Sequence, residues 1–394
     1  MSTAAVPPRV RSGLLLGAAL LLVTLNLRLP IGAVSPVLHD IRDDLGLSAS
    51  AAGLLTTLPV LCFGFAAGLV PALARRLGQE AVLLAVVVVI GLGTAMRLVP
   101  EVAPLYLGTF VLGVAIAVGN VLMPSVIKRR FASPGVMLGV FTAGFSIAAG
   151  LATGLTVPLE DLLGDWRWAI GAWGLVAVVA GLVWTPFVVS AGRAPLAAGP
   201  RAGRLRRDRV AWLVTITFAL QSFLFYAFLA WTPEILQDAG LSEGRAGAMV
   251  SIATVCAIPA SLAAPVIAQR RTSQELLAFA CSVTWIPGLL GLMFFADTLT
   301  PLWMLFLGVG QGVGVSYALT LVVLRAPDAA HAAALSGMAQ GVGYIAAAPA
   351  PFAVGALHDL TGGWDAALWL LLVVAALLLV SGLAAGRPGM VGDP

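Results

Sequence analysis

Long apolar stretches alternate with short polar segments along almost the whole chain. Each stretch holds about 20 residues, the length that an α-helix needs to cross the hydrocarbon core of a bilayer. We therefore predict an all-α membrane protein with twelve transmembrane helices. Their expected positions are 13–38, 50–72, 81–97, 102–127, 135–157, 168–189, 211–233, 245–268, 275–296, 300–324, 332–356 and 364–385.

The composition agrees with a membrane protein. Of the 394 residues, 60% are hydrophobic and 10% are charged, and the mean hydropathy is +1.01. Soluble domains carry about 25% charged residues. The first apolar stretch is longer than the apolar region of a signal peptide, about 7–15 residues, so we expect it to remain as a transmembrane helix.

The basic residues are distributed unevenly between the two sides of the predicted membrane. With the N-terminus in the cytoplasm, 17 of the 22 Lys and Arg residues fall inside, and Arg42, Arg97, Arg167 and Arg245 fall outside. This is the positive-inside distribution of a multi-pass protein of the inner (plasma) membrane with both termini in the cytoplasm. It argues against nucleic acid as a partner for the net charge of +4. The count leaves one basic residue within the membrane, Arg28.

The two halves of the chain repeat one another. The segment 46–48 (GLS) recurs at 240–242, and Arg130 is matched by Arg325. We predict an N-terminal six-helix bundle at 1–190, a basic cytoplasmic linker at 191–210 and a C-terminal six-helix bundle at 211–394. Two parallel, pseudo-symmetric halves of this kind resemble the major facilitator superfamily, in which the halves rock around a central site near the bilayer midplane.

Arg28 lies near the middle of the first predicted helix, where a charge is costly. An arginine there costs roughly 2.5–3.5 kcal/mol on insertion scales, so a partner is expected. No predicted helix carries an Asp or Glu at mid-depth; the deepest, Glu234, lies about 12 Å above the level of Tyr226. We therefore predict that Arg28 binds an anionic substrate, because its planar guanidinium suits carboxylates, nitro groups and small anions. The alternative is a structural anchor, in which Arg28 donates to backbone carbonyls such as that of Asn26, which Pro30 leaves free.

Uncharged polar side chains at mid-depth are the other candidates for substrate contact. In a continuous helix, Thr24 shares the face of Arg28 together with Gly32 and Ser35. Asn26 points elsewhere and is expected to hydrogen-bond a neighbouring helix. For each candidate, a bond to the next helix is an equally good interpretation. Besides Arg28 and Thr24, the predicted substrate contacts are Gln311, Tyr344, Gln340, Tyr226, Asn120 and Ser146.

The sequence holds no constellation typical of an enzyme or a metal centre. The three cysteines lie inside predicted helices without paired or metal-ligand spacing, and the three histidines lie at helix ends. We therefore predict a protein that is not an enzyme and needs no cofactor or metal. Because no carboxylate lies at mid-depth, we also predict that any proton travels with the substrate as a weak acid, or that the cycle is exchange or facilitated flux.

Three other functions have to be weighed against transport of an anion. A proton-coupled exporter of hydrophobic drugs would not need a charged Arg28. A membrane receptor would need an output domain and an intramembrane enzyme would need a catalytic set, and we find no sign of either in the sequence.

Particular motifs resemble one transporter family. The similarity lies in NLRLPIGAVSPVLHDIRDDLGLS (26–48), AGLLTTLPVLCFG (52–64) and GNVLMPSVIKRRF (119–131). These segments resemble the cyanate transporter family of the major facilitator superfamily, which includes cyanate carriers and nitroimidazole exporters and is distantly similar to nitrate/nitrite porters. The resemblance implies an alternating-access secondary transporter of a small anion, weak acid or nitro compound that works as a monomer. It also implies that Arg28 is the anion contact.

One loop departs from the wider superfamily. Between the second and third helices, the usual Gly, Asp-Arg and Gly-Arg-Arg pattern is replaced by PALARRLGQE (71–80). Arg75 replaces the Asp, and Gln79 and Glu80 replace the basic pair. The charge relay that latches the two halves in other members is therefore not expected in its usual form, and Arg76 with Glu80 is a candidate replacement.

Overall fold

The protein folds into helices. The computed structural model describes residues 8–191 and 202–392, and these residues contain no strand. The N-terminal half consists of α1 (Pro8–Asn26), α2 (Leu29–Gly32), η1 (Ser35–Val37), α3 (Leu38–Leu45), α4 (Ala49–Ala66), η2 (Ala67–Leu69), α5 (Val70–Leu77), α6 (Gln79–Met96), α7 (Val102–Arg130), α8 (Pro134–Leu163), α9 (Trp166–Ala172) and α10 (Gly174–Ala191). The C-terminal half consists of α11 (Ala202–Leu205), α12 (Arg209–Asp238), α13 (Glu243–Gln269), α14 (Glu275–Phe295), α15 (Thr300–Leu324), α16 (Ala329–Ala347), α17 (Ala350–Thr361) and α18 (Asp365–Gly386).

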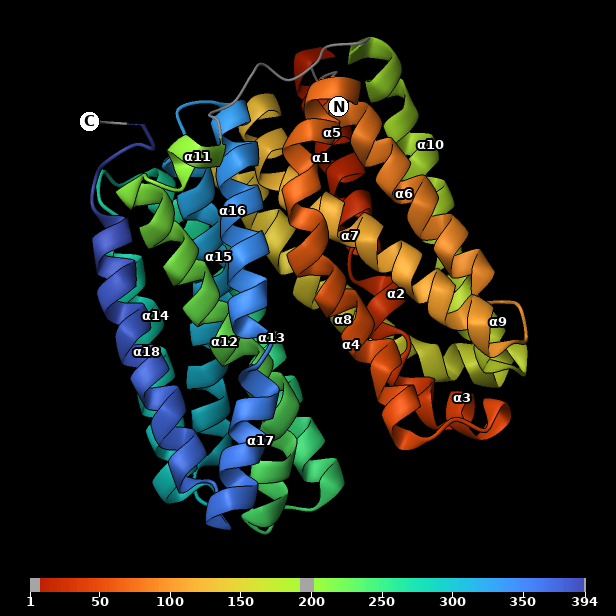
Figure 1. The fold of residues 1–394 in the computed structure, drawn as a ribbon, viewed down its shortest axis with the longest axis vertical. Helices are drawn as coiled ribbons and strands as arrows, with labels where there is room; N and C mark the ends of the chain where they lie inside the picture. Colours follow the sequence, from red (N-terminus) through yellow and green to blue (C-terminus); the bar gives the residue numbers. More distant parts are fainter. Residues whose placement is uncertain (1–7, 192–201, 393–394) are drawn as a thin grey trace, which may run out of the picture.

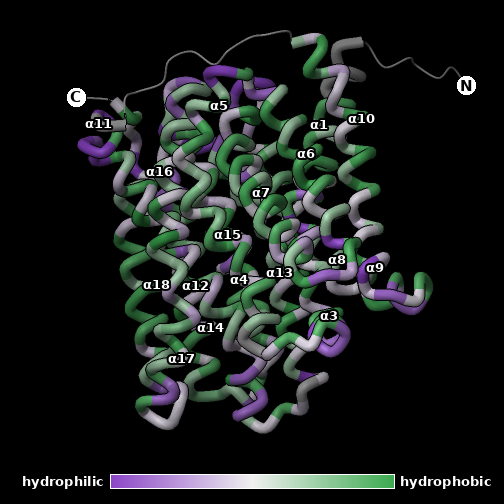
Figure 2. The backbone as a smooth tube through the Cα atoms, turned by 45° about the vertical axis from the view of Figure 1, so that its right-hand side comes forward, coloured by the Kyte–Doolittle hydropathy of each residue, from purple (hydrophilic) through white to green (hydrophobic). Residues whose placement is uncertain are grey.

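Most of these helices are built to cross a bilayer. Within the described ranges, eleven helical segments are long and apolar enough to do so. The predicted helix at 332–356 is not among these eleven, because it is divided into α16 and α17 at Pro349, which has no N–H to continue the helical ladder. Figure 2 shows hydrophobic positions along the length of the long helices and hydrophilic ones mainly at their two ends. The predicted all-α architecture with twelve membrane helices is confirmed, and several of these helices are divided into shorter elements.

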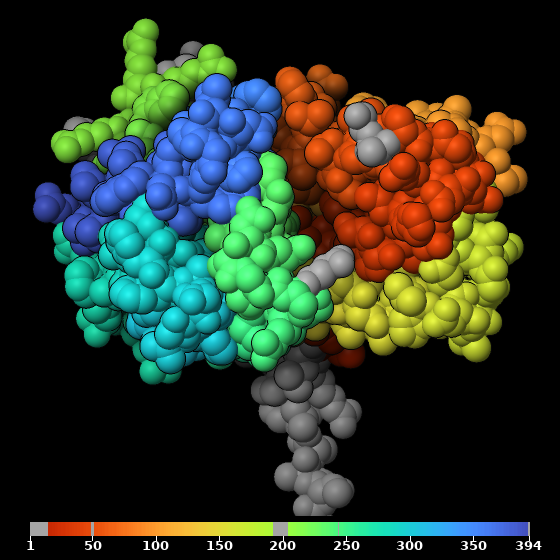
Figure 3. Space-filling view, turned by 90° about the horizontal axis from the view of Figure 1, so that it is seen from below, coloured from red at the N-terminus to blue at the C-terminus, as the bar shows by residue number. Residues whose placement is uncertain are grey.

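The two halves lie side by side and differ in how closely they meet at their two ends (Figure 1). We call the end that holds Ala191 and Ala202 the linker end and the opposite one the far end. Residues 192–201, which make up much of the predicted linker at 191–210, lie outside the described residues. Figure 3, a view from the far end, shows a hollow between the halves.

Hydrogen bonds between the halves gather at the linker end. Ser125 Oγ donates to the carbonyl oxygen of Ala329 (2.6 Å), and Lys128 Nζ donates to that of Val323 (2.7 Å). Other bonds of this kind join Gly135 to Gln269, Thr142 to Ser261 and Ser316, and Gln340 to Asn120. All of these residues lie in the linker-side part of their helices. The molecule is therefore closed at the linker end and open at the far end.

The candidate pairing of Arg76 with Glu80 is wrong. Glu80 is buried at the start of α6 and accepts a 2.7 Å hydrogen bond from Arg130 Nε of α7, and Arg129 Nη1 lies 3.8 Å from its other oxygen. Arg76 is exposed on α5. Because α7 runs antiparallel to α6 and returns to the linker end, its basic C-terminal turn reaches Glu80, and this pairing lies within the N-terminal half.

Glycine allows the closest helix contact of the C-terminal half. A Cβ atom on Gly308 of α15 would lie 2.2 Å from the carbonyl oxygen of Ala253 and 2.7 Å from its Cα. A Cβ on Gly312, one turn later, would lie 2.3 Å from the carbonyl oxygen of Ala257. The backbones of α13 and α15 therefore touch without intervening side chains, as small residues permit in membranes.

We expect Gly308→Ala to separate α13 from α15, because its new methyl group has no space. Overpacking of this kind costs about 1–3 kcal/mol. Thermal unfolding of the purified protein in detergent should therefore occur at a lower temperature. Gly150→Ala is the matched control, because a Cβ at Gly150 meets nothing within 4 Å. Equal unfolding temperatures for the two variants would contradict the close contact.

We expect Lys128→Met to loosen the linker end, because it removes the donor that joins α7 to α15. The measurement is labelling of a cysteine at Ser336, which is fully buried in α16, by a membrane-impermeant maleimide. Labelling should be faster in the Lys128→Met background than in the wild-type background. Arg75→Met is the control, because Arg75 is an exposed cation at the same end. If both backgrounds label Ser336→Cys at the same rate, Lys128 does not hold this end closed.

Candidate functional site

The first membrane helix is interrupted at Arg28. The predicted span 13–38 lies in one membrane-crossing segment, but this segment is broken rather than only bent, because α1 ends at Asn26 and α2 begins at Leu29. Arg28 itself has φ −133° and ψ −38°, outside the helical values. Pro30 explains the break, because it has no N–H to donate to the carbonyl of Asn26. The face that Thr24, Gly32 and Ser35 were expected to share with Arg28 is therefore not continuous.

Aromatic rings surround the Arg28 side chain, which is half-buried. Its guanidinium carbon lies 4.3 Å from the ring centroid of Phe145 on α8 and 5.8 Å from that of Phe63 on α4. Two tyrosine rings extend this group, because Tyr344 packs against Phe63 and Tyr226 packs against Tyr344. Cations are attracted to the faces of aromatic rings within about 6 Å. We call Phe63, Phe145, Tyr226 and Tyr344 the aromatic cage.

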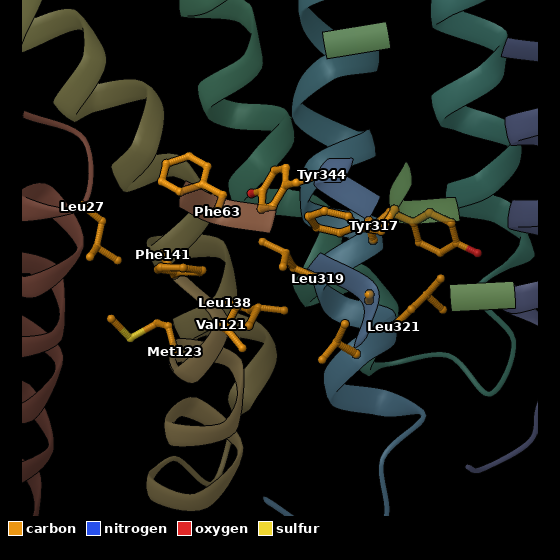
Figure 4. Close-up of a cluster of buried hydrophobic side chains, with 14 of the residues drawn as sticks. Leu27, Phe63, Val121, Met123, Leu138, Phe141, Tyr317, Leu319, Leu321 and Tyr344 are labelled. Atoms are coloured by element: carbon orange, nitrogen blue, oxygen red, sulfur yellow. The ribbon is translucent and has the colours of Figure 1, made fainter. Parts of the chain in front are cut away.

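The aromatic cage joins the two halves of the molecule. The ring of Tyr344 on α16 lies 5.4 Å from Phe63, 5.2 Å from Phe218 and 6.3 Å from Tyr226, measured between centroids. Phe63 belongs to the N-terminal half, whereas Tyr344, Phe218 and Tyr226 belong to the C-terminal half. Figure 4 shows Phe63 and Tyr344 next to one another. The cage therefore lies where two rocking halves would meet.

No carboxylate balances the charge of Arg28. Within residues 8–191 and 202–392, no Asp or Glu forms an ion pair with it. Glu234, the deepest acid expected from the sequence, is exposed on α12. Among the same residues, no group of three or more His, Cys, Asp or Glu side chains could hold a metal ion. The site is thus an unneutralised cation among aromatic faces.

The structure brings three predicted contacts together and leaves others apart. Arg28, Tyr226 and Tyr344 meet in the aromatic cage. Gln340 is buried and uses its amide nitrogen to bond the carbonyl of Asn120 at 3.1 Å, across the boundary between the halves. The side chain of Asn120 is buried with both polar atoms unpartnered. A substrate role for Gln340 and Asn120 stays a prediction.

The remaining predicted contacts differ in how accessible they are. Thr24 is fully buried and donates to the carbonyl of Leu20 within its own helix (2.8 Å). Ser146 is half-buried and directly follows Phe145 of the cage. Gln311 on α15 is 8% exposed and has no hydrogen-bond partner among the described residues. Substrate contact by Thr24, Ser146 and Gln311 also stays a prediction. Of the three, Ser146 is the best placed for it.

Asn26 bonds a neighbouring helix, as expected. Its amide nitrogen donates to the carbonyl of Val176 on α10 at 3.3 Å and to that of Leu22 in its own helix at 2.8 Å. The bond to α10 holds the end of α1 directly before the break. The prediction of an interhelical role for Asn26 is confirmed.

Sequence reasoning missed a second buried arginine. The sequence assigns Arg97 to the outer side of the membrane and gives no sign of its burial; in the structure it is fully buried at the end of α6, where its Nη1 donates to the carbonyl of Pro30 at 2.8 Å. It also missed Phe63 and Phe145 of the cage. The available signal for Phe145 was its place next to Ser146 at mid-depth. Nothing in the sequence distinguishes an arginine that ends a helix in water from one covered by a neighbouring segment.

Known transporters are similar to this chain over most of its length. The family model of the Major Facilitator Superfamily matches residues 20–348. The chain is 39% identical to the uncharacterized transporter YycB of Bacillus subtilis (93% of this chain, 92% of the relative) and 34% identical to the 2-nitroimidazole transporter of Escherichia coli (96% of each). It is 28% identical to the cyanate transport protein CynX of Escherichia coli (91% and 94%). Among solved structures, FucP in the outward conformation superposes with a TM-score of 0.76 at 12% identity, over 94% of this chain and 98% of FucP.

Proposed function

The chain belongs to the major facilitator superfamily, and we propose that this transporter carries a small, planar anion or nitro compound by alternating access, with Arg28 as its binding charge. One observation carries the proposal: Arg28 has an unneutralised charge inside an aromatic cage to which both halves contribute. A substrate in this position contacts both halves at once, which is what coupling of binding to rocking requires.

The chemistry of the site favours planar, delocalised anions. A guanidinium offers a flat fork of N–H donors that pairs with the two oxygens of a carboxylate or nitro group. Aromatic rings at the same place stack on flat, conjugated molecules. Relatives named for 2-nitroimidazole and cyanate transport support this class, because both compounds are small and conjugated. Binding an anion also relieves the electrostatic cost of holding Arg28 in the membrane.

We infer that the conformation faces outward. The positive-inside distribution assigns the linker end to the cytoplasm, and this is the closed end. In the proposed cycle, residues 1–190 and 211–394 move as two bodies joined by the linker at 191–210. Closure of the far end around a bound anion would precede separation of Lys128 from α15. The protein would act as a monomer in the inner (plasma) membrane.

The rival function is proton-coupled efflux of hydrophobic drugs. The aromatic cage alone would suit such compounds. A proton relay, however, uses carboxylates or histidines inside the bundle. Glu234 is the acid that the sequence predicts to lie deepest in the membrane. In the described part of the chain it is exposed, at the far end of α12. Glu234 is therefore not placed for such a relay. Drug efflux would also give the charge of Arg28 no role.

We expect anions to stabilise the wild-type protein and to bind Arg28→Gln at least about tenfold more weakly, because a charge-assisted hydrogen bond contributes about 1.5–3 kcal/mol. The probes are benzoate, nitrate, cyanate and 2-nitroimidazole, and the measurement is the thermal shift of purified protein against probe concentration. Arg42→Gln is the control, because Arg42 is exposed and carries the same charge. Equal stabilisation of wild type and Arg28→Gln by anions would sink the proposal, and stabilisation by lipophilic cations instead would favour the drug exporter.

We expect Glu234→Gln to transport as fast as the wild type, because an exposed carboxylate without a buried partner is not placed for a proton relay. Uptake of radiolabelled benzoate into proteoliposomes, with and without an imposed pH gradient, measures this. A substrate-driven proton flux that disappears in Glu234→Gln would show that the coupling prediction is wrong.

A further inference from the structure

Arg97 is a buried cation with too few partners. No part of it is exposed, and it lies directly after α6, whose Gly93 packs against Gly108 of α7. A Cβ on Gly108 would lie 2.9 Å from Cγ of Arg97, so the missing side chain of Gly108 leaves the room that Arg97 occupies. Its Nε and Nη2 have no hydrogen-bond partner, and no described carboxylate pairs with it. Burying a charge in this way is expensive, so a purely structural role is a poor explanation for Arg97.

The one hydrogen bond of Arg97 holds the segment that carries Arg28. Nη1 of Arg97 donates to the carbonyl oxygen of Pro30 at 2.8 Å, and Pro30 lies two residues after Arg28. In a continuous helix the N–H of Val34 would occupy that oxygen, but here it bonds the carbonyl of Ile31 at 3.3 Å. Arg97 therefore takes up a carbonyl group that the interrupted helix leaves free.

The opposite side of α2 is fixed by close packing. A Cβ on Gly32 would lie 3.0 Å from Cβ of Ala152 on α8. The short helix α2 is thus held between α8 and the end of α6, and α8 also carries Phe145, the ring nearest to the Arg28 charge. The position of the Arg28 guanidinium relative to Phe145 depends on both supports.

We propose that Arg97 is a positioning residue for substrate binding: its bond to Pro30 fixes the break in the first helix so that Arg28 points into the aromatic cage. This inference rests on the proposed role of Arg28 as the anion contact. A binding group must be held within about 0.5 Å of its working position, and a carbonyl left without its donor would allow α2 to shift by more than that. The stability lost by burying Arg97 is then offset by its contribution to substrate binding, as is common at binding sites.

The test compares wild type, Arg97→Met, Arg97→Lys, Arg28→Gln and Arg42→Gln, with benzoate as the anionic probe and benzamide as its neutral isostere. We expect Arg97→Met to bind benzoate about tenfold more weakly, to bind benzamide as the wild type does, and to unfold at the same or a higher temperature, because an unpaired buried charge has been removed. Arg97→Lys keeps a cationic N–H donor group and should restore most of the benzoate affinity. Arg42→Gln should match the wild type throughout.

Each alternative result has a distinct meaning. If Arg97→Met binds benzoate as tightly as the wild type does, Arg97 does not position Arg28. If it loses affinity for both probes and unfolds at a lower temperature, Arg97 only supports the fold, and the proposal is overturned. If benzoate fails to bind the wild type, or binds Arg28→Gln equally well, the proposed function fails first. Loss of benzoate binding in Arg28→Gln alone refutes the role of Arg97 and leaves that of Arg28 intact.

Discussion

A guanidinium inside a bilayer must be stabilised by something other than water, and the N-terminal half is arranged around this requirement. For Arg28 the solution is a pair of aromatic faces and partial exposure. For Arg97 it is the carbonyl of Pro30 and the C-terminal end of α6, where the helix dipole favours a cation. Both solutions depend on the same interruption of the first helix. Because no described carboxylate neutralises either arginine, this half keeps a positive interior, and an anion arriving from solution is its natural counter-charge.

The repeat between the halves conserves positions but not their chemistry. Arg130 and Arg325 are repeat mates at the linker ends of α7 and α15. Arg130 pairs with the carboxylate of Glu80, whereas Arg325 bonds the amide oxygen of Gln274 and the carbonyl of Ala385 at 3.0 Å. A charged pair in one half is thus replaced by a neutral acceptor in the other. The two bundles share a frame, but the buried arginine of the C-terminal one, Arg325, is held by neutral acceptors alone.

The sequence was sufficient for the architecture and for the central residue of the site. Apolar stretches of about 20 residues gave the membrane helices, because the thickness of the bilayer sets their length. The cost of an intramembrane charge singled out Arg28, and no acidic partner for it occurs among the described residues. Tyr226 and Tyr344 were found by their depth along their helices, although depth alone also selected Thr24, whose hydroxyl bonds its own helix.

The rest depended on contacts between distant segments. Pro30 indicated a freed carbonyl, but whether the helix bends or breaks depends on what packs around it, here Arg97 and α8. The partner of Glu80 lies fifty residues away on α7 rather than four residues away on the same turn. Helical spacing predicts local neighbours, and only the packing of antiparallel helices brings Arg130 close. The same reason explains why neither the burial of Arg97 nor the position of Phe63 was predicted.

The contact between Phe63 and Tyr344 spans the boundary between two bodies that move relative to each other in the proposed cycle. Every turnover must therefore slide or part these rings and form them again. The rings that recognise a flat substrate then also resist the motion of the two halves. Substrate affinity and transport rate therefore depend on the same two side chains. A larger or more strongly stacking ring at either position would raise the affinity for substrate and lower the transport rate. The pairing of Phe with Tyr is thus a compromise between substrate binding and substrate release.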